Sequence, residues 1–343
     1  MPVTSARRTG AATTVRSIAV GESRVVPLLA LTVVVGAIFA LLGPGFLSSF
    51  NINSLTQVAA QSAVIGLAQA ALMVMGRINL AVGGIGVVVV AFIGILSTST
   101  GLPLPLILLL ALGLGALAGA LMAAVELLTG LNSFVVTLAF LSVYQGGVLL
   151  LTQATHYQVS DPTLTRIGNG MFLSPYLSPL LAVAVVIGVL LWLFYFRTSP
   201  GWKARAVGAN QRAAAASGIR VKRTVVQGYM LSGVLSAVAG IMEIARLAEA
   251  SPSTGSDWLL LSFIGPLLAG VALSGGSISI AGIIIGSLFY GGIFSGLVIL
   301  NVPTYWLTLA QAVVLLAALV LGQLGPKLAR RLAGSRTRGV RNA

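Results

Sequence analysis

Long apolar runs separated by short breaks of glycine, proline, asparagine or charged residues dominate this chain. A membrane-crossing helix needs about 20 mostly apolar residues. The runs that approach this length are residues 25–43, 54–75, 79–98, 104–128, 133–152, 175–196, 225–247, 258–274, 279–299 and 304–322. The pattern therefore predicts an all-α polytopic membrane protein with about ten transmembrane helices.

The composition supports this class. Hydrophobic residues make up 57% of the 343 residues and charged residues only 8%, whereas soluble domains carry about a quarter charged residues. The chain has 41 glycines, with small residues clustered around Gly113, Gly115 and Gly119. Because small residues allow helix backbones to approach closely in lipid, we expect a compact bundle.

The charge is strongly basic, with 20 Lys and Arg against 6 Asp and Glu, a net charge of +14. Such a balance often indicates nucleic-acid binding. Here the basic residues gather in blocks at 7–24, 197–223 and 327–341, each beside a long apolar run. Cytoplasmic loops of membrane proteins carry this excess. We therefore expect a lipid bilayer as partner, no nucleic acid, and both termini in the cytoplasm.

This topology divides the chain into a cytoplasmic tail over 1–24, a transmembrane domain over 25–322 and a basic cytoplasmic tail over 323–343. A cytoplasmic loop over 197–224 interrupts the transmembrane domain, and the sparse loop 153–174 falls on the opposite side. No cleavage site follows the first apolar run, so we interpret that run as a retained helix.

Residues for catalysis are scarce. The chain has no cysteine, which excludes disulfides and thiol chemistry, and its one histidine, His156, lies in the predicted external loop. No phosphate-binding Gly-x4-Gly-Lys-Ser/Thr stretch is present. We therefore expect no catalytic residues, no metal site and no cofactor bound by this chain. If transport is driven by ATP, another polypeptide must bind the ATP.

Polar side chains inside apolar spans are costly and thus candidates for function. Gln57, Gln61 and Gln69 are spaced so that they lie near one face of a helix. Their amides suit a solute path, because they both donate and accept hydrogen bonds. The alternative is hydrogen bonding between helices.

A break between two closely spaced runs contains Arg77 and Asn79. Irregular backbone at such a break is able to contact a solute where it lines a cavity. Alternatively, Arg77 is only a cytoplasmic anchor. The stretch 76–83 also weakly resembles 276–282, which is expected for corresponding positions of two structural repeats, although chance similarity explains it equally well.

Acidic residues are few near the spans. Glu126 lies near the predicted cytoplasmic end of a helix, where we expect it to be solvated. Glu243, Arg246 and Glu249 are three residues apart, and we expect them to form an ion-pair set along one helix face.

The most specific motif follows the sixth apolar run. It reads Thr198-x-x-Gly201, then Ala206-x-Gly208-x-Asn210, Ala213-Ala214 and Ser217-Gly218-Ile219. A second stretch, 132–138, is followed by Tyr144-Gln145-Gly146. Together these motifs resemble the monosaccharide permeases of ABC importers, the ribose, xylose and galactoside type, over residues 25–322.

This resemblance implies a bundle like that of type II importers, with two related halves, in the bacterial cytoplasmic membrane. It implies a second permease, an extracytoplasmic solute-binding protein, and cytoplasmic ABC ATPase subunits that bind ATP-Mg. The implied contacts with the ATPase are Gly201, Gly208, Asn210, Arg212, Ala213, Ala214, Ser217 and Gly218. Further candidates for the solute path are Asn79, Asn132, Phe134, Tyr144 and Gln145.

The basic loop also has a physical basis for this role. Its residues 198–224 contain six Lys and Arg and no acid, and the stretch 210–217 reads as a short capped helix that ends at Gly218. Such a helix is able to transmit force from a soluble partner. The alternative is a solvated loop that only satisfies topology.

The chain departs from the family pattern at acidic positions. Asn79 stands where the family has Asp, and Leu259, Leu260 and Leu261 replace a Glu-Leu-Asp. Carboxylates are strong acceptors for sugar hydroxyls. Either the solute is not a common pentose, or this chain is one half of a heterodimer, which is the hypothesis that we favour.

Two other functions are possible at this level. An ion-coupled secondary transporter would need acids or histidine in the membrane, and the sequence indicates almost none that are buried there. A permease for branched-chain amino acids shares the same plan of helices. The sequence does not name the solute.

Overall fold

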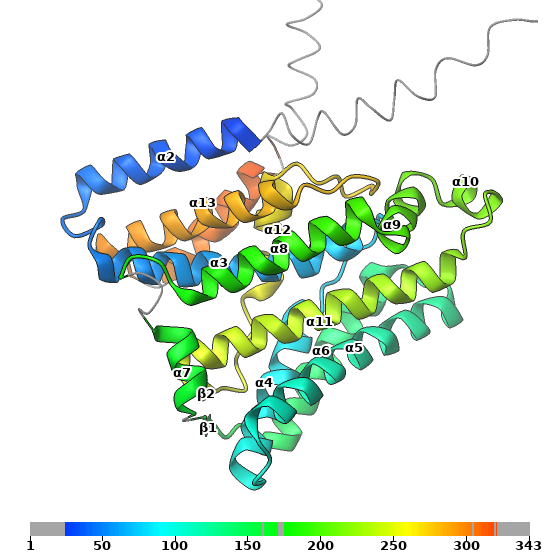
Figure 1. The fold of residues 1–343 in the computed structure, drawn as a ribbon, viewed down its shortest axis with the longest axis horizontal. Coiled ribbons are helices and arrows are strands. Elements are labelled where there is room, and N and C mark those ends of the chain that lie inside the picture. Colours follow the sequence, from blue (N-terminus) through cyan, green and yellow to red (C-terminus); the bar gives the residue numbers. More distant parts are fainter. Residues whose placement is uncertain (1–24, 160, 171–174, 304, 319, 321–343) are drawn as a thin grey trace, which may run out of the picture.

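The fold was analysed in a computed structural model, which describes residues 25–159, 161–170, 175–303, 305–318 and 320. The predicted tails 1–24 and 323–343 lie outside the described residues. The structure is a bundle of helices whose long axes run in similar directions (Figure 1).

Within the described residues, eight helices are long and apolar enough to cross a membrane. They are α2 (Val25–Leu42), α3 (Ser49–Met73), α4 (Val82–Ser99), α5 (Leu104–Thr129), α6 (Ser133–Thr152), α8 (Pro179–Arg197), α11 (Val221–Leu247) and α13 (Ile280–Ile299). Two shorter apolar helices, α12 (Trp258–Leu268) and Tyr305–Ala318, account for the remaining predicted runs. The prediction of an all-α polytopic membrane protein is confirmed.

The prediction of a continuous span over 258–274 was wrong. Helix α12 ends at Leu268, and the chain continues to Ser279 without regular structure. Gly270, Gly275 and Gly276 have φ angles of 75°, 88° and 87°. Because these positive angles are incompatible with a right-handed helix, apolar composition alone does not continue α12.

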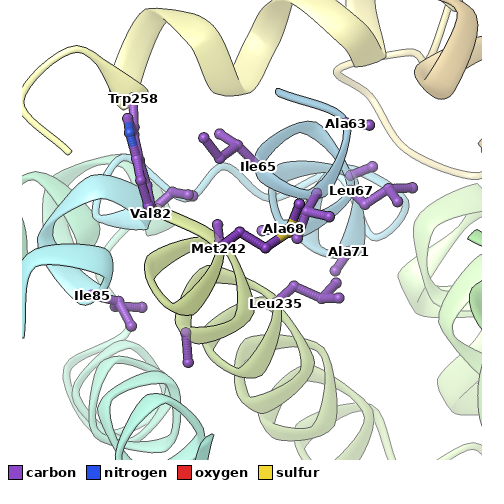
Figure 2. Packing of buried hydrophobic residues seen from close by; sticks show 14 of the residues in the cluster. Ala63, Ile65, Leu67, Ala68, Ala71, Val82, Ile85, Leu235, Met242 and Trp258 are labelled. Atoms are coloured by element: carbon purple, nitrogen blue, oxygen red, sulfur yellow. The ribbon is translucent and has the colours of Figure 1, made fainter. Parts of the chain in front are cut away.

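Helix α3 lies at the centre of the bundle. In its most apolar stretch of 18 residues, 83% of the residues are buried. The corresponding share is 6% for α2, which lies at the edge of the bundle. Leu235 and Met242 of α11 pack near Ile65 and Ala68 of α3 (Figure 2). The core is thus built around α3.

Small residues set the distance between α5 and α11. A Cβ atom on Gly119 would lie 2.2 Å from the carbonyl oxygen of Tyr229, and one on Gly115 would lie 2.5 Å from that of Gly233. The two backbones are therefore in direct contact. This agrees with the close packing expected from the clusters of small residues.

A small cap covers one end of the bundle (Figure 1). It consists of α7 (Pro162–Asn169) and the antiparallel strands β1 (Tyr157–Gln158) and β2 (Glu249–Ala250). The short α9 (Ser199–Ala209) and α10 (Gln211–Ala216) lie at the opposite end, between α8 and α11.

The ion-pair set predicted for α11 forms only in part. Arg246 Nη2 lies 3.1 Å from both carboxylate oxygens of Glu243, which confirms that pair. Glu249 instead contacts His156. The prediction for Glu249 was wrong because α11 ends at Leu247, so this side chain leaves the helix face. His156 therefore joins the two strands of the cap.

Candidate functional site

The basic segment after α8 is helical along most of its length. Asn210 caps α10 by accepting a hydrogen bond from the Ala213 N–H (3.0 Å), and Gly218 follows with a φ of 82°. The predicted short capped helix is confirmed. The sequence analysis predicted no helix before it, but Thr198 caps α9, and proline is favoured in a first helical turn.

The side chains of this segment divide into buried and exposed groups. Ala214 packs with Val207 and Ile219 in a small apolar cluster that holds α9 and α10 together. The predicted ATPase-contact residues Asn210, Arg212, Ala213, Ser217 and Gly218 are exposed. Their neighbours Trp202 and Lys203 are exposed as well. The segment thus offers a basic surface on a rigid support.

Gly201 fixes the corner between α8 and α9. A Cβ atom at this position would lie 2.1 Å from the Phe194 carbonyl oxygen. The guanidinium carbon of Arg205 lies 4.6 Å from the centre of the Phe196 ring, a cation–π contact with α8. The corner and the stacked ring tie α9 firmly to α8.

Helix α9 ends against two breaks inside the bundle, at a place that we call the junction (Val74, Gly76, Gly208, Gly275 and Gly276). A Cβ atom on Gly208 would lie 1.9 Å from the Val74 carbonyl oxygen and 2.6 Å from the Gly276 nitrogen. The Gly276 N–H donates to the Val74 carbonyl oxygen over 2.8 Å. Three separate parts of the chain therefore meet through backbone atoms.

The two weakly similar stretches 76–83 and 276–282 are thus neighbours in space. A Cβ atom on Gly275 would lie 2.5 Å from the Gly76 nitrogen. Each stretch lies between two apolar helices, α3 and α4 or α12 and α13. Their common descent as structural repeats stays a prediction.

Three N–H groups of the break between α3 and α4 are bonded to side chains. The N–H groups of Ile78 and Leu80 donate to the hydroxyls of Ser133 (3.3 Å) and Thr137 (3.1 Å) on α6. The Ala81 N–H donates to Asn79 Oδ1 over 2.9 Å. These groups are therefore not available to a solute, in contrast to the interpretation of the break as exposed backbone.

Asn79 is fully buried and bonded at both ends of its amide. Its Nδ2 donates to the Ser232 hydroxyl over 2.9 Å, and that hydroxyl donates to the Ala68 carbonyl oxygen over 2.7 Å. The side chain therefore links the break to α11 and α3. Its role in the solute path stays a prediction.

Arg77 and Glu126 form a buried ion pair. The Arg77 Nε lies 2.7 Å from one carboxylate oxygen of Glu126, and the Tyr229 hydroxyl contacts the other. The expectation that Glu126 is solvated was wrong, whereas Arg77 as a cytoplasmic anchor stays a prediction. Because the two side chains are only 14% and 8% exposed, each charge needs the other.

The three glutamines of α3 have different surroundings. Gln57 Nε2 donates to Asn53 (3.0 Å) and to Asn169 of the cap (3.4 Å). Gln61 is buried. Gln69 is fully buried, and neither its Nε2 nor its Oε1 has a hydrogen-bond partner. Gln69 is therefore the glutamine whose environment calls for an explanation.

The candidates on α6 lie elsewhere in the bundle. Asn132 caps this helix by accepting from the Phe134 N–H (3.0 Å), and the Phe134 ring is exposed. The Tyr144 hydroxyl donates to the Ala118 carbonyl oxygen of α5 (2.8 Å), and Gln145 is half-buried. The structure does not bring these residues together with Gln69, and their function stays a prediction.

Sequence reasoning did not single out Ser62 and Ser287. Both are buried, and neither hydroxyl has a partner. Single serines in helices rich in glycine and alanine give no signal, because they normally bond a carbonyl of their own helix. Only the packing identifies them.

Comparisons with known proteins agree with this geometry. The sequence model of the family described as "Branched-chain amino acid transport system / permease component" matches residues 51–319. No solved structure matches the chain.

Several relatives are named as sugar permeases. The ribose import permease protein of Bacillus subtilis (strain 168) is 31% identical over 300 residues, which cover 86% of this chain and 91% of the relative. The L-arabinose ABC transporter permease protein of Azospirillum brasilense is 29% identical, with 84% of each chain covered. The D-allose transport system permease protein of Escherichia coli (strain K12) is 27% identical, over 85% of this chain and 89% of the relative. The chain therefore belongs to this permease family, among the monosaccharide permeases of ABC importers.

Proposed function

We propose that this chain translocates a monosaccharide, or a similar small polar solute, across the bacterial cytoplasmic membrane by alternating access. As a permease it is a transport component and not an enzyme. The relatives are named for ribose, L-arabinose and D-allose. These names favour a sugar over the branched-chain amino acids in the family's description.

In this proposal, α9 and α10 form the coupling segment that contacts the cytoplasmic ATPase subunits. Binding of ATP-Mg by those subunits supplies the free energy, and this chain binds no nucleotide. The exposed Arg212 and Lys203 contribute to a surface for an acidic partner. The tails 1–24 and 323–343 then also face the cytoplasm, as positive charge requires.

The contact of Gly208 with the junction carries the proposal. Because the Gly208 backbone touches both Val74 and Gly276, a tilt of α9 displaces the breaks that end α3 and precede α13. Movement of the coupling segment thus reaches the helices of both halves without intervening side chains. Packed backbones shift between discrete arrangements more readily than they deform, which suits a two-state transporter.

The remaining partners follow from the same orientation. The extracytoplasmic solute-binding protein docks at the end that carries α7, β1 and β2, opposite to α9 and α10. A second permease completes the translocation unit, and we favour a heterodimer because Asn79 and Leu259 to Leu261 replace acids of the family pattern. A working transporter assembled from this permease alone and its ATPase would contradict the heterodimer.

Reconstitution tests the function. The permease, its ATPase and its binding protein are placed in proteoliposomes, and uptake of labelled ribose, arabinose and leucine is measured with ATP. We expect uptake of a sugar that stops with vanadate or with an ATPase that cannot hydrolyse ATP. Sugar uptake that is unchanged by either treatment would overturn the proposal, and leucine uptake alone would reassign the solute.

A further inference from the structure

Helices α3 and α13 pack against each other in opposite directions. A Cβ atom on Gly291 would lie 3.0 Å from the Ala59 Cβ, and one on Gly66 would lie 3.2 Å from the Ile283 Cγ2. These two contacts fix an antiparallel register, in which Ser287 lies opposite Ser62. We call this contact, with the adjoining face of α12, the seam.

Two serine hydroxyls thus face the same level of the seam. Ser62 is 3% exposed and Ser287 is 1% exposed, and neither Oγ has a hydrogen-bond partner. A buried serine in a helix commonly donates to a carbonyl one turn earlier. Ser236 does so within α11, donating to the Ser232 carbonyl oxygen over 2.9 Å. The hydroxyls of Ser62 and Ser287 make no such hydrogen bond.

Gln69 adds an amide to the same face. It lies seven residues after Ser62 and three after Gly66, so the helical repeat places all three along one side of α3. Its side chain is completely buried, with both amide atoms unpartnered. Unpaired polar atoms in a dry interior are costly and rare, and therefore need an explanation.

Small groups close the seam against α12. A Cβ atom on Gly66 would lie 3.1 Å from the Cδ of Pro266 of α12, and one on Gly265 would lie 3.0 Å from the Ser287 Oγ. Pro266 removes a hydrogen bond from the α12 ladder, which weakens that helix at this level. The seam is thus in contact with a helix whose own hydrogen-bond ladder is interrupted at this level.

The seam is also connected to the junction. Helix α3 ends next to Val74, and α13 begins four residues after Gly276. A displacement at the junction therefore shifts the two helices that form the seam. Ser62 lies near the middle of the 25-residue α3, the depth at which transporters bind their solutes.

We propose that Ser62, Gln69 and Ser287 are hydrogen-bonding groups of a solute site for a neutral polyol, enclosed in the seam and opened during the transport cycle. The proposal rests on the proposed function and names residues of its solute path. Two hydroxyls and one amide offer donors and acceptors without charge, which matches the hydroxyls of a sugar. In the closed seam these groups have no partner, and in the open seam the solute or water supplies one.

Stability and transport separate this role from a structural one. Gln69→Leu replaces the unpartnered amide with an apolar side chain, so we expect an unchanged or higher thermal midpoint and at least a tenfold loss of ATP-driven sugar uptake. Ser232→Ala is the matched control: it removes a buried serine whose hydrogen bonds are all made, and it lowers the midpoint. A fall in midpoint for Gln69→Leu as large as that for Ser232→Ala, or uptake within twofold of wild type, would overturn the proposal.

The absence of cysteine from the chain allows a second test. Ser62→Cys and Ser287→Cys each introduce the sole thiol, which is treated with a polar thiol reagent in the full complex. We expect labelling at least tenfold faster during ATP turnover than at rest, and slower labelling when the transported sugar is present. Ser236→Cys, buried within α11, is the control and stays unlabelled in both conditions.

Equal labelling rates at rest and during turnover would overturn the seam as a solute site. ATP-dependent sugar uptake by the wild-type complex is measured in the same preparations. Loss of that activity would refute the proposed function, whereas intact uptake with equal labelling rates would refute only the seam.

Discussion

The break between α3 and α4, which adjoins the junction, and the seam between α3 and α13 treat polar groups in opposite ways. Around the break, the side chains of Asn79, Ser133, Thr137 and Glu126 all have hydrogen-bond partners. In the seam, Ser62, Gln69 and Ser287 have unpartnered atoms. Satisfied networks favour one arrangement. We infer that the break moves as a rigid unit, whereas the seam opens and takes up solute or water.

Substitution of Gly208 should give the largest effect on transport. In Gly208→Val the side chain would collide with the backbone of Val74 and Gly276 and separate α9 from the junction. We expect ATP-driven uptake to fall at least fiftyfold while ATP hydrolysis by the assembled complex continues. Gly113→Ala, at a position with open space around it, serves as control. Uptake close to the wild-type rate in Gly208→Val would show that the junction does not couple the two events.

Loss of one partner of the buried ion pair should give the largest effect on stability. Glu126→Leu leaves the Arg77 charge buried and unpaired, which costs about 3–5 kcal/mol. The measurement is the free energy of unfolding in detergent. The double variant Arg77→Met with Glu126→Leu should recover most of this loss, because it removes both charges. A double variant no more stable than Glu126→Leu would show that the pair is not the cause.

Thr137→Val tests the hydrogen-bonded break between α3 and α4 with a smaller change. The substitution keeps the shape but removes the acceptor of the Leu80 N–H, which is buried. An unsatisfied buried N–H costs about 1–3 kcal/mol. Thr129→Val, at an exposed helix end, is the control and should change the thermal midpoint little. Equal effects of the two variants would mean that the hydroxyl of Thr137 does not hold the break.

The smallest effect is expected at the cap. The contact of His156 with Glu249 joins two side chains that are 59% and 43% exposed. Exposed ion pairs contribute about 0–1 kcal/mol, and less at high salt. His156→Ala should therefore shift the thermal midpoint only slightly, and Glu249→Gln should do the same. A large shift that persists in high salt would show that the cap stabilises the bundle more than its exposure suggests.

Local patterns predicted much of this structure, although two local features were missed. The apolar runs placed the long helices, and the cap at Asn210 was predictable because a cap depends on neighbouring residues. The end of α12 was missed although it is also local: Gly270 has a positive φ, and the N–H groups of Gly270 and Val271 donate to the carbonyl oxygens of Leu267 and Pro266. Helix α9 was missed because Pro200 and Gly201 also occur in loops.

The candidate site was less predictable than the fold. The glutamines of α3 were found by their polarity in an apolar run, but the run gives no sign that both amide atoms of Gln69 are buried without partners. Ser62 and Ser287 are separated by more than 200 positions and become neighbours only through the packing of glycines. The same holds for Arg77, whose partner Glu126 lies 49 residues later.

That ion pair also imposes an order on the synthesis of the protein. When the ribosome has delivered α3 and the break, Glu126 still lies 49 residues ahead, and Tyr229 follows it by another 103. Until α5 is inserted, the Arg77 guanidinium has to stay at the hydrated membrane surface, since an unpaired charge is costly in the lipid interior. The break between α3 and α4 therefore cannot reach its packed arrangement during translation before the fourth of the long helices has arrived.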